Sequence, residues 1–170
     1  KKKNKKIVAR GAASGVLGMI SLIVFLFYSW PSMPEISSLA DRLAYVFTMN
    51  VIAIIPFFIT LVAVGNARFL SKAINPLAHE EGESMQIDAR VSDNTLQQNF
   101  VFFVGTLALS IILPDEQMKI IFVLTIVFVL ARIVFWVGYR MNPLYRAPGM
   151  AATSYMNLGI LLTALYLYFY

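Results

Sequence analysis

The chain has 170 residues, of which 59% are hydrophobic and 14% charged, and its formal net charge is +5. Soluble domains carry about a quarter charged residues, so this composition and a mean hydropathy of +0.71 indicate an integral membrane protein. The lack of cysteine excludes disulfides, thiolate metal sites and a cysteine nucleophile. The single histidine, His79, lies in an acidic stretch and predicts no metal site, and no phosphate-binding loop, dinucleotide fingerprint or serine-hydrolase motif is present.

The first predicted membrane span is Ile7–Trp30, preceded by a run of lysines. A basic start and an apolar core are also typical of a secretion signal, but no small-residue cleavage site follows, and an aromatic end favours a retained helix. The lysines indicate topology and contact with anionic lipid rather than nucleic acid. Gly11 and Gly15, four residues apart, permit close approach of another helix. The prolines at 31 and 34 are expected to end the span.

Four further segments are long enough to cross a bilayer, which takes about 20 apolar residues. They are Leu43–Leu70, Asn94–Leu113, Met118–Tyr139 and Met150–Tyr170. Pro56 predicts a kink in the first of these. Turn residues predict a tight turn at 113–116, a short connection at 143–149, and a solvated loop at 73–89.

The sequence therefore predicts an all-α integral membrane protein in two parts. Residues 1–42 form a basic segment and an additional transmembrane helix, and residues 43–170 form a four-helix membrane domain. Lysine and arginine gather at one set of span ends: residues 1–10, then Arg68, Lys72 and Arg90, then Arg140 and Arg146. The positive-inside rule then predicts a cytoplasmic N-terminus and a C-terminus on the opposite side.

Polar residues at the start of the third segment form one stripe. Arg90, Asn94 and Gln97 are spaced i, i+4 and i+7, which places them on one helical face. An arginine at the centre of a membrane helix costs at least about 2.5–3.5 kcal/mol, so such residues usually face a site or a partner. A structural alternative is an interfacial Arg90 with amides that bond neighbouring helices, for about 0.6 kcal/mol each.

A second stripe lies near the end of the fourth segment, where Arg132, Phe135, Trp136 and Tyr139 again share a face. Arg132 is about two turns inside the segment, a depth that requires pairing or hydration. Because successive spans alternate in direction, both stripes are predicted at the same membrane side. The structural alternative here is an internal salt bridge of Arg132 with Asp93.

Two further cations, Arg68 and Arg146, are predicted at the same helix ends. Each alone is an ordinary positive-inside residue. Together with both stripes they predict a cationic, amide-rich pocket that suits a small anion with carboxylate and amide groups, since arginine binds carboxylates in a bidentate way and side-chain amides satisfy peptide groups.

The ordered series of these residues resembles the MAPEG family, the membrane-associated proteins of eicosanoid and glutathione metabolism. The series is Ala67-Arg68…Pro76-Leu77, then Arg90-x-x-x-Asn94-x-x-Gln97, then Arg132…Gly138-Tyr139…Arg146. The resemblance covers roughly Leu43 to the C-terminus, so the first span would be an addition to a four-helix bundle of MAPEG type. It implies a homotrimer with glutathione between neighbouring protomers near the cytoplasmic face.

The resemblance also implies roles for individual residues. Arg90 and Asn94 fall on positions that contact glutathione, and Arg68 matches an arginine that reaches in from the adjacent protomer. Tyr139 matches a tyrosine beside the thiol, and Arg146 matches the arginine that stabilises the thiolate. Arg132 is a further candidate residue of the glutathione site, and Arg132 or Tyr139 is the second choice for the residue that stabilises the thiolate.

Four positions depart from the family pattern. Gln97 stands where the family commonly has a glutamate for the glutathione amino group. Gln98 stands where one branch of the family has a ligand-binding tyrosine, and Phe135 replaces another tyrosine. Phe69 stands where that same branch has a second functional arginine. These departures indicate a diverged member of the family.

The sequence supports three hypotheses of function. The first is a glutathione-dependent transferase or peroxidase acting on hydrophobic small molecules dissolved in membrane lipid, with Arg146 and Tyr139 as its catalytic residues. The second is a non-catalytic lipid-binding or scaffold subunit, whose first helix docks another membrane subunit. The third is a small transporter or channel, although its spans lack a carboxylate relay.

Overall fold

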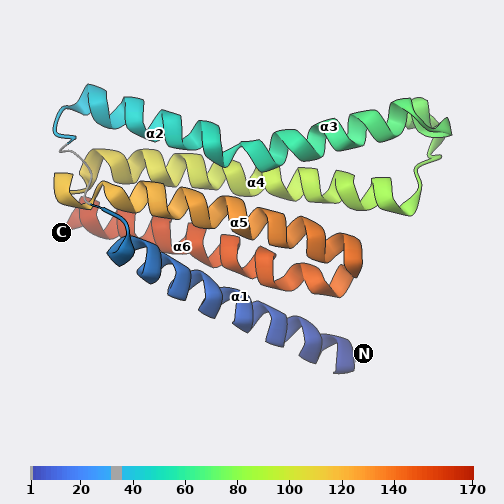
Figure 1. Cartoon of the computed structure of the whole chain (residues 1–170), viewed down its shortest axis with the longest axis horizontal. Coiled ribbons are helices and arrows are strands. Elements are labelled where there is room, and N and C mark those ends of the chain that lie inside the picture. Colours follow the sequence, from blue (N-terminus) through green and yellow to red (C-terminus); the bar gives the residue numbers. More distant parts are fainter. Residues whose placement is uncertain (1, 32–35) are drawn as a thin grey trace.

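The computed structural model describes residues 2–31 and 36–170, and over these residues the chain is a bundle of long helices (Figure 1). The described residues contain five helical segments long and apolar enough to cross a membrane. The helices are α1 (Lys2–Ser29), α2 (Leu39–Ala53), α3 (Ile55–Phe69), α4 (Glu83–Ile112), α5 (Lys119–Met141) and α6 (Ala147–Phe169). The two termini lie at opposite ends of the bundle (Figure 1), as five crossings require. The predicted role of the proline at 34 lies outside the described residues.

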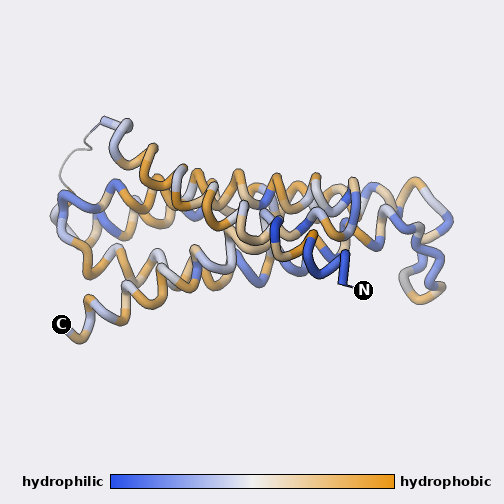
Figure 2. Tube along the Cα trace, turned by 90° about the horizontal axis from the view of Figure 1, so that it is seen from below, coloured by the Kyte–Doolittle hydropathy of each residue, from blue (hydrophilic) through white to orange (hydrophobic). Residues whose placement is uncertain are grey.

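The basic N-terminal stretch is the start of α1, and hydrophilic colour is concentrated there in Figure 2. Farther along, α1 packs tightly against the start of α6. A Cβ added at Gly15 would lie 2.1 Å from the carbonyl oxygen of Pro148, and one at Gly11 would lie 3.3 Å from the Cβ of Ala147. The predicted close approach of another helix at these glycines is therefore confirmed.

The second crossing is broken into α2 and α3, with the junction at Ile54. Pro56 is the cause, because it has no N–H and its ring clashes with the carbonyl four residues before it. Proline fits only in the first turn of a new helix, which is its place in α3. The predicted kink is confirmed, and it bends α3 away from α5 while α3 remains beside α4 (Figure 1).

The connections differ in length from those predicted. The turn at 113–116 is confirmed, with a 3-10 helix at Asp115–Gln117. The loop after α3 is shorter than the predicted 73–89, because α4 already begins at Glu83, where Gly82 is its N-cap. It holds the 3-10 helices Lys72–Ile74 and Pro76–Ala78. The connection before α6 is also shorter, because Pro148 and Gly149 lie in the first turn of α6 and only the 3-10 helix Pro143–Arg146 separates it from α5.

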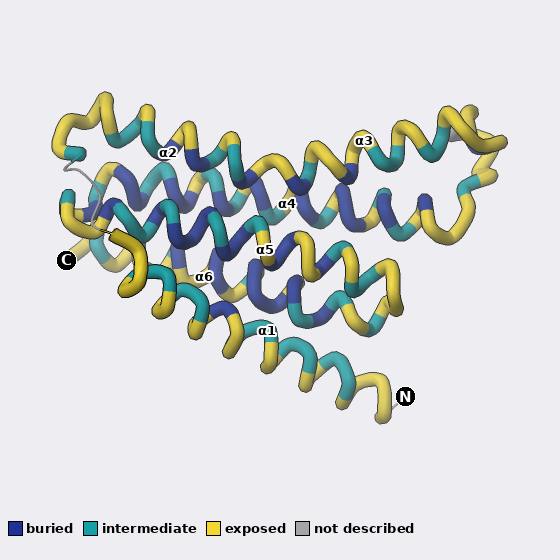
Figure 3. Tube along the Cα trace, in the orientation of Figure 1, coloured by how far each residue is buried: buried dark blue, intermediate teal, exposed yellow. Residues whose placement is uncertain are grey.

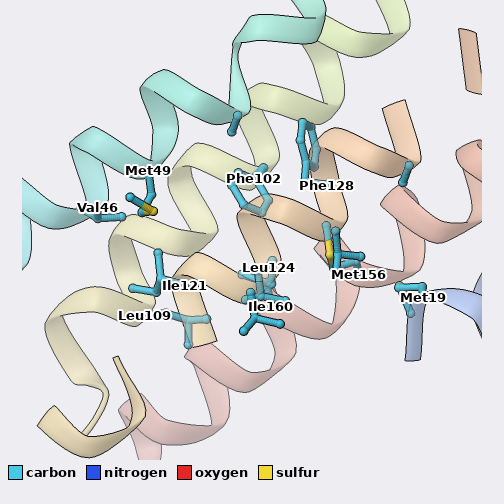
Figure 4. Packing of buried hydrophobic residues seen from close by; sticks show 14 of the residues in the cluster. Met19, Val46, Met49, Phe102, Leu109, Ile121, Leu124, Phe128, Met156 and Ile160 are labelled. Atoms are coloured by element: carbon cyan, nitrogen blue, oxygen red, sulfur yellow. The ribbon is translucent and has the colours of Figure 1, made fainter. Parts of the chain in front are cut away.

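The core lies where α4, α5 and α6 face one another and α2 (Figure 3). Phe102 and Phe128 are fully buried there, with ring centroids 4.5 Å apart (Figure 4). The buried hydroxyls of Thr106 and Thr125 do not disturb this packing, because each donates to a carbonyl of its own helix at 2.8 Å. The outer faces of α1, α2 and α3 are exposed and apolar, as membrane contact requires.

Candidate intramembrane polar site

The polar stripe of α4 divides between the surface and the interior. Arg90 and Gln97 are exposed, whereas Asn94 is half-buried between α4 and α5. No described side chain forms a hydrogen bond or ion pair with Arg90 or Gln97. The outward face of α4 therefore presents an arginine and an amide in a helix of bilayer length.

Behind this stripe lies Arg132, which is only 1% exposed. Its Nη1 donates to Oδ1 of Asn94 at 3.0 Å, and its guanidinium lies 4.1 Å from the ring centroid of Phe135. Its Nε and Nη2 are buried without a hydrogen-bond partner among the described residues. The two stripes lie at the same end of the bundle, as the alternating direction of the helices predicted, and Asn94 and Arg132 are the two residues that meet.

The structural alternative, a salt bridge of Arg132 with Asp93, is wrong. Asp93 is exposed, and Arg132 is in none of the ion pairs of the described residues. Successive residues of a helix point about 100° apart, so Asn94 faces α5 while Asp93 turns away from it.

Arg146 and Tyr139 lie together at the same end of α5. The Arg146 guanidinium is 5.4 Å from the Tyr139 ring centroid, and its Nη1 donates to the carbonyl of Pro143 at 2.6 Å. The approach depends on Gly138, because a Cβ there would lie 2.4 Å from the carbonyl oxygen of Tyr145. The short connection thus returns the chain close enough to place Arg146 over Tyr139.

Arg68 lies apart from these residues within one chain, at the end of α3. It forms an ion pair with Glu81 at 3.0 Å, and its Nη1 is buried without a partner among the described residues. The structure therefore brings Asn94 to Arg132 and Tyr139 to Arg146, and it leaves Arg90 and Gln97 on the surface. Arg68 stays at the end of α3, paired with the loop residue Glu81. The described residues contain no grouping of side chains that could hold a metal ion.

Sequence reasoning missed a second polar cluster, centred on Asp88 of α4. Asp88 is 2% exposed; its Oδ1 accepts from Nε of Arg140 at 2.8 Å and from Nε1 of Trp136 at 2.7 Å, and its Oδ2 pairs with Nη2 of Arg140. The signal for this cluster was an acid and a base at matching depth on successive spans.

It also missed the polar link between α4 and α6. Asn157 donates through Nδ2 to Oε1 of Gln98 at 2.8 Å and to the Gln98 carbonyl at 3.0 Å, and Nε2 of Gln98 donates to Ser154 at 3.3 Å. An asparagine in the middle of an apolar span was the available signal. Gln98 is therefore engaged in hydrogen bonds within the chain.

With this geometry in place, the comparisons with known proteins define the class. The MAPEG family model matches residues 45–166, and the chain belongs to that family. The matched region runs from within α2 into α6, and α1 lies before it. The prediction of a MAPEG-type helical membrane bundle is thus confirmed, and the chain is a multi-pass integral membrane protein.

The individual relatives are larger proteins. The chain is similar to Transmembrane protein 79 of Mus musculus, with 24% identity over 164 residues, or 94% of this chain and 42% of the mouse protein. It is similar to Transmembrane protein 79 of Bos taurus, with 26% identity over 145 residues, or 85% of this chain and 36% of that protein. The chain spans about two fifths of the length of these curated relatives. The mouse match is long enough to extend into α1. No solved structure matches the chain.

Proposed function

We propose that the chain is a membrane-embedded, glutathione-dependent transferase or peroxidase acting on hydrophobic molecules that enter from the lipid. Glutathione would lie between neighbouring copies in a homotrimer, near the cytoplasmic face. The observation that carries this proposal is the α4 stripe, with Arg90 and Gln97 outward and Asn94 held by a buried Arg132 behind them.

The stripe favours a ligand between copies because a lone protomer would leave Arg90 and Gln97 facing the hydrocarbon of the bilayer. Exposed charge and amide groups are costly in hydrocarbon and usually face a site, a partner or water. A second copy would shield this face from lipid, and an anionic peptide would supply carboxylates for Arg90 and carbonyls for the amides. Arg68, which is partly exposed and pairs with Glu81 within one chain, would reach this site from the neighbouring copy.

The groups of the chain fit glutathione in part. Arg90 and Asn94 provide donors for carboxylate and peptide oxygens, but Gln97 offers the glutathione ammonium a neutral carbonyl rather than a carboxylate. We therefore expect Gln97 to bind glutathione more weakly than a glutamate at the same position would.

The proposed chemistry is activation of a thiol. A guanidinium beside a thiol favours the thiolate, which is the nucleophile. Arg146 holds its charge over Tyr139 at the end of α5, and we assign it the stabilisation of the thiolate, with Tyr139 at the thiol-side wall. The tripeptide would enter from the cytosol, and the apolar acceptor from the bilayer between helices.

Glutathione titration of the detergent-solubilised protein, followed by the ultraviolet absorbance of the thiolate, tests this assignment. We expect a saturable thiolate signal that disappears in Arg146→Ala. Arg10→Ala, which removes an exposed cation at the start of α1, is the matched control and should keep the signal. An unchanged thiolate signal in Arg146→Ala would show that the assigned role is wrong.

A second candidate is a non-catalytic lipid-binding or scaffold subunit, and two side chains favour it. Gln98 is engaged with Asn157 and Ser154, and Phe135 is 2% exposed against Arg132. At neither position does the side chain provide the tyrosine hydroxyl that the family resemblance implies there. The same titration separates the candidates, because binding of glutathione without a thiolate signal, or no binding at all, favours this second function.

A further inference from the structure

An apolar cavity of about 480 Å³ lies between α1 and the helices α4, α5 and α6, at the end of the bundle that carries the C-terminus. Its walls come from four helices: Met19, Ile23 and Phe27 of α1, Leu109 of α4, Leu124 of α5 and Ile160 of α6 are among them. The cavity exists because α1 packs against the start of α6 at Gly11 and Gly15 and separates from α6 toward the end of the bundle that carries the C-terminus (Figure 2). The site thus depends on a helix that lies before the matched MAPEG region.

A cation lies beside this cavity at its membrane-surface end. Nζ of Lys119 is 4.7 Å from the ring centroid of Phe27, which lines the cavity, and it donates to the carbonyl of Trp30 at 3.1 Å. None of the ion pairs among the described residues includes Lys119. The other cation at this end, Arg42, is neutralised by Asp115 and bonds the carbonyls of Ser110 and Leu113.

We propose that this cavity binds one acyl chain of an anionic glycerophospholipid, whose phosphate pairs with Lys119. Most of the wall is hydrocarbon and sulfur, which suits an acyl chain, and Tyr28, Gln117, Tyr155 and Thr163 are its polar members. Methionines such as Met19 can adapt to the shape of the chain. The ammonium at the membrane surface supplies the complementary charge for the phosphate. This lipid site is independent of the proposed glutathione site, which lies at the opposite end of α5.

Gly159 allows the cavity to be filled without disturbing the fold. It lines the cavity, and a Cβ added to it meets nothing within 4 Å. Gly159→Phe is therefore the test variant. Gly65→Phe is its control, because a Cβ at that exposed glycine of α3 also meets nothing within 4 Å. Thr163→Phe, at an exposed residue of the cavity wall, is a second filling variant.

The experiment is native mass spectrometry of the delipidated full chain, titrated with dioleoylphosphatidylglycerol in detergent. We expect one tightly retained lipid per chain for the wild type and for Gly65→Phe, and loss of that lipid in Gly159→Phe and Thr163→Phe. Lys119→Gln should bind about fivefold more weakly, because a basic residue near a membrane surface contributes about that factor. Lys72→Gln, an exposed lysine at the other end, should bind like the wild type.

Glycerol phosphate should not displace the lipid, because it carries the phosphate without the acyl chains. The proposal is overturned if the wild type retains no lipid. It is also overturned if both filling variants, with unchanged thermal unfolding, retain as much lipid as the wild type, or if Gly65→Phe loses it equally.

Discussion

Two polar clusters join α4 to α5 in this protein, and they differ in how completely their groups are paired. Around Asp88, both carboxylate oxygens accept hydrogen bonds, from Arg140 and Trp136. Around Arg132, one nitrogen donates to Asn94 and two are buried without partners among the described residues. A closed cluster of the first kind holds helices together, whereas an open one of the second kind has donors left for another group.

The two clusters are expected to contribute to different properties, the Asp88 cluster to stability and the Arg132 cluster to binding. Asp88 should matter for the fold and little for a ligand, because its hydrogen bonds are already made inside the chain. Arg132 should matter for a ligand and little for the fold, because burying a charge without a carboxylate gives little net stabilisation.

The largest expected effect on stability follows removal of the closed cluster. Asp88→Ala leaves Arg140 and Trp136 without their acceptor, and we expect a loss of about 3 kcal/mol in unfolding free energy. Thermal and denaturant unfolding in detergent measure it. Asp93→Ala, which removes an exposed acid from the same helix, is the control and should change stability by less than about 0.5 kcal/mol. Equal effects of the two variants would contradict the closed-cluster interpretation.

Arg132→Met tests the open cluster. Replacement of a buried, incompletely paired charge by an apolar side chain of similar length should leave unfolding free energy unchanged or raise it by about 1 kcal/mol. Glutathione affinity, measured by calorimetry, should fall about tenfold because Asn94 loses the group that orients it. A destabilisation as large as that of Asp88→Ala would instead make Arg132 a structural residue.

Gln98→Leu is expected to have a smaller effect on stability than Asp88→Ala and, unlike Arg132→Met, no effect on binding. It removes the hydrogen bonds to Asn157 and Ser154, and a hydrogen bond between membrane helices contributes about 0.6 kcal/mol. We expect a loss of about 1 kcal/mol and unchanged glutathione binding. A large loss of binding would show that Gln98 faces the ligand in the assembled protein.

Several features of the fold could be predicted because they depend on the chain alone. The length of the apolar segments sets the number of crossings, and the missing N–H of Pro56 sets the break before α3. The meeting of the two stripes follows from the alternating direction of successive spans. Gly15 predicted a close contact, although not that Pro148 would be its neighbour.

The partners within the site depended on helix rotation, which packing determines and hydropathy does not. Asp93 and Asn94 are adjacent in sequence, yet only Asn94 faces Arg132, so a rotation of one residue was enough to assign the wrong partner. The pairing of Asp88 with Arg140 and that of Gln98 with Asn157 required the same information. Oligomeric contacts of Arg68, Arg90 and Gln97 are predictions that need a second copy to test.

The most direct test of the central claim is calorimetric titration of glutathione into the detergent-solubilised wild type and the variants Arg90→Ala and Asp88→Asn. We expect saturable binding to the wild type and to Asp88→Asn, measured at a temperature at which that variant is folded, and loss of binding in Arg90→Ala. Failure of the wild type to bind glutathione, or equal binding by Arg90→Ala, would contradict the claim that the outward stripe of α4 is a glutathione site.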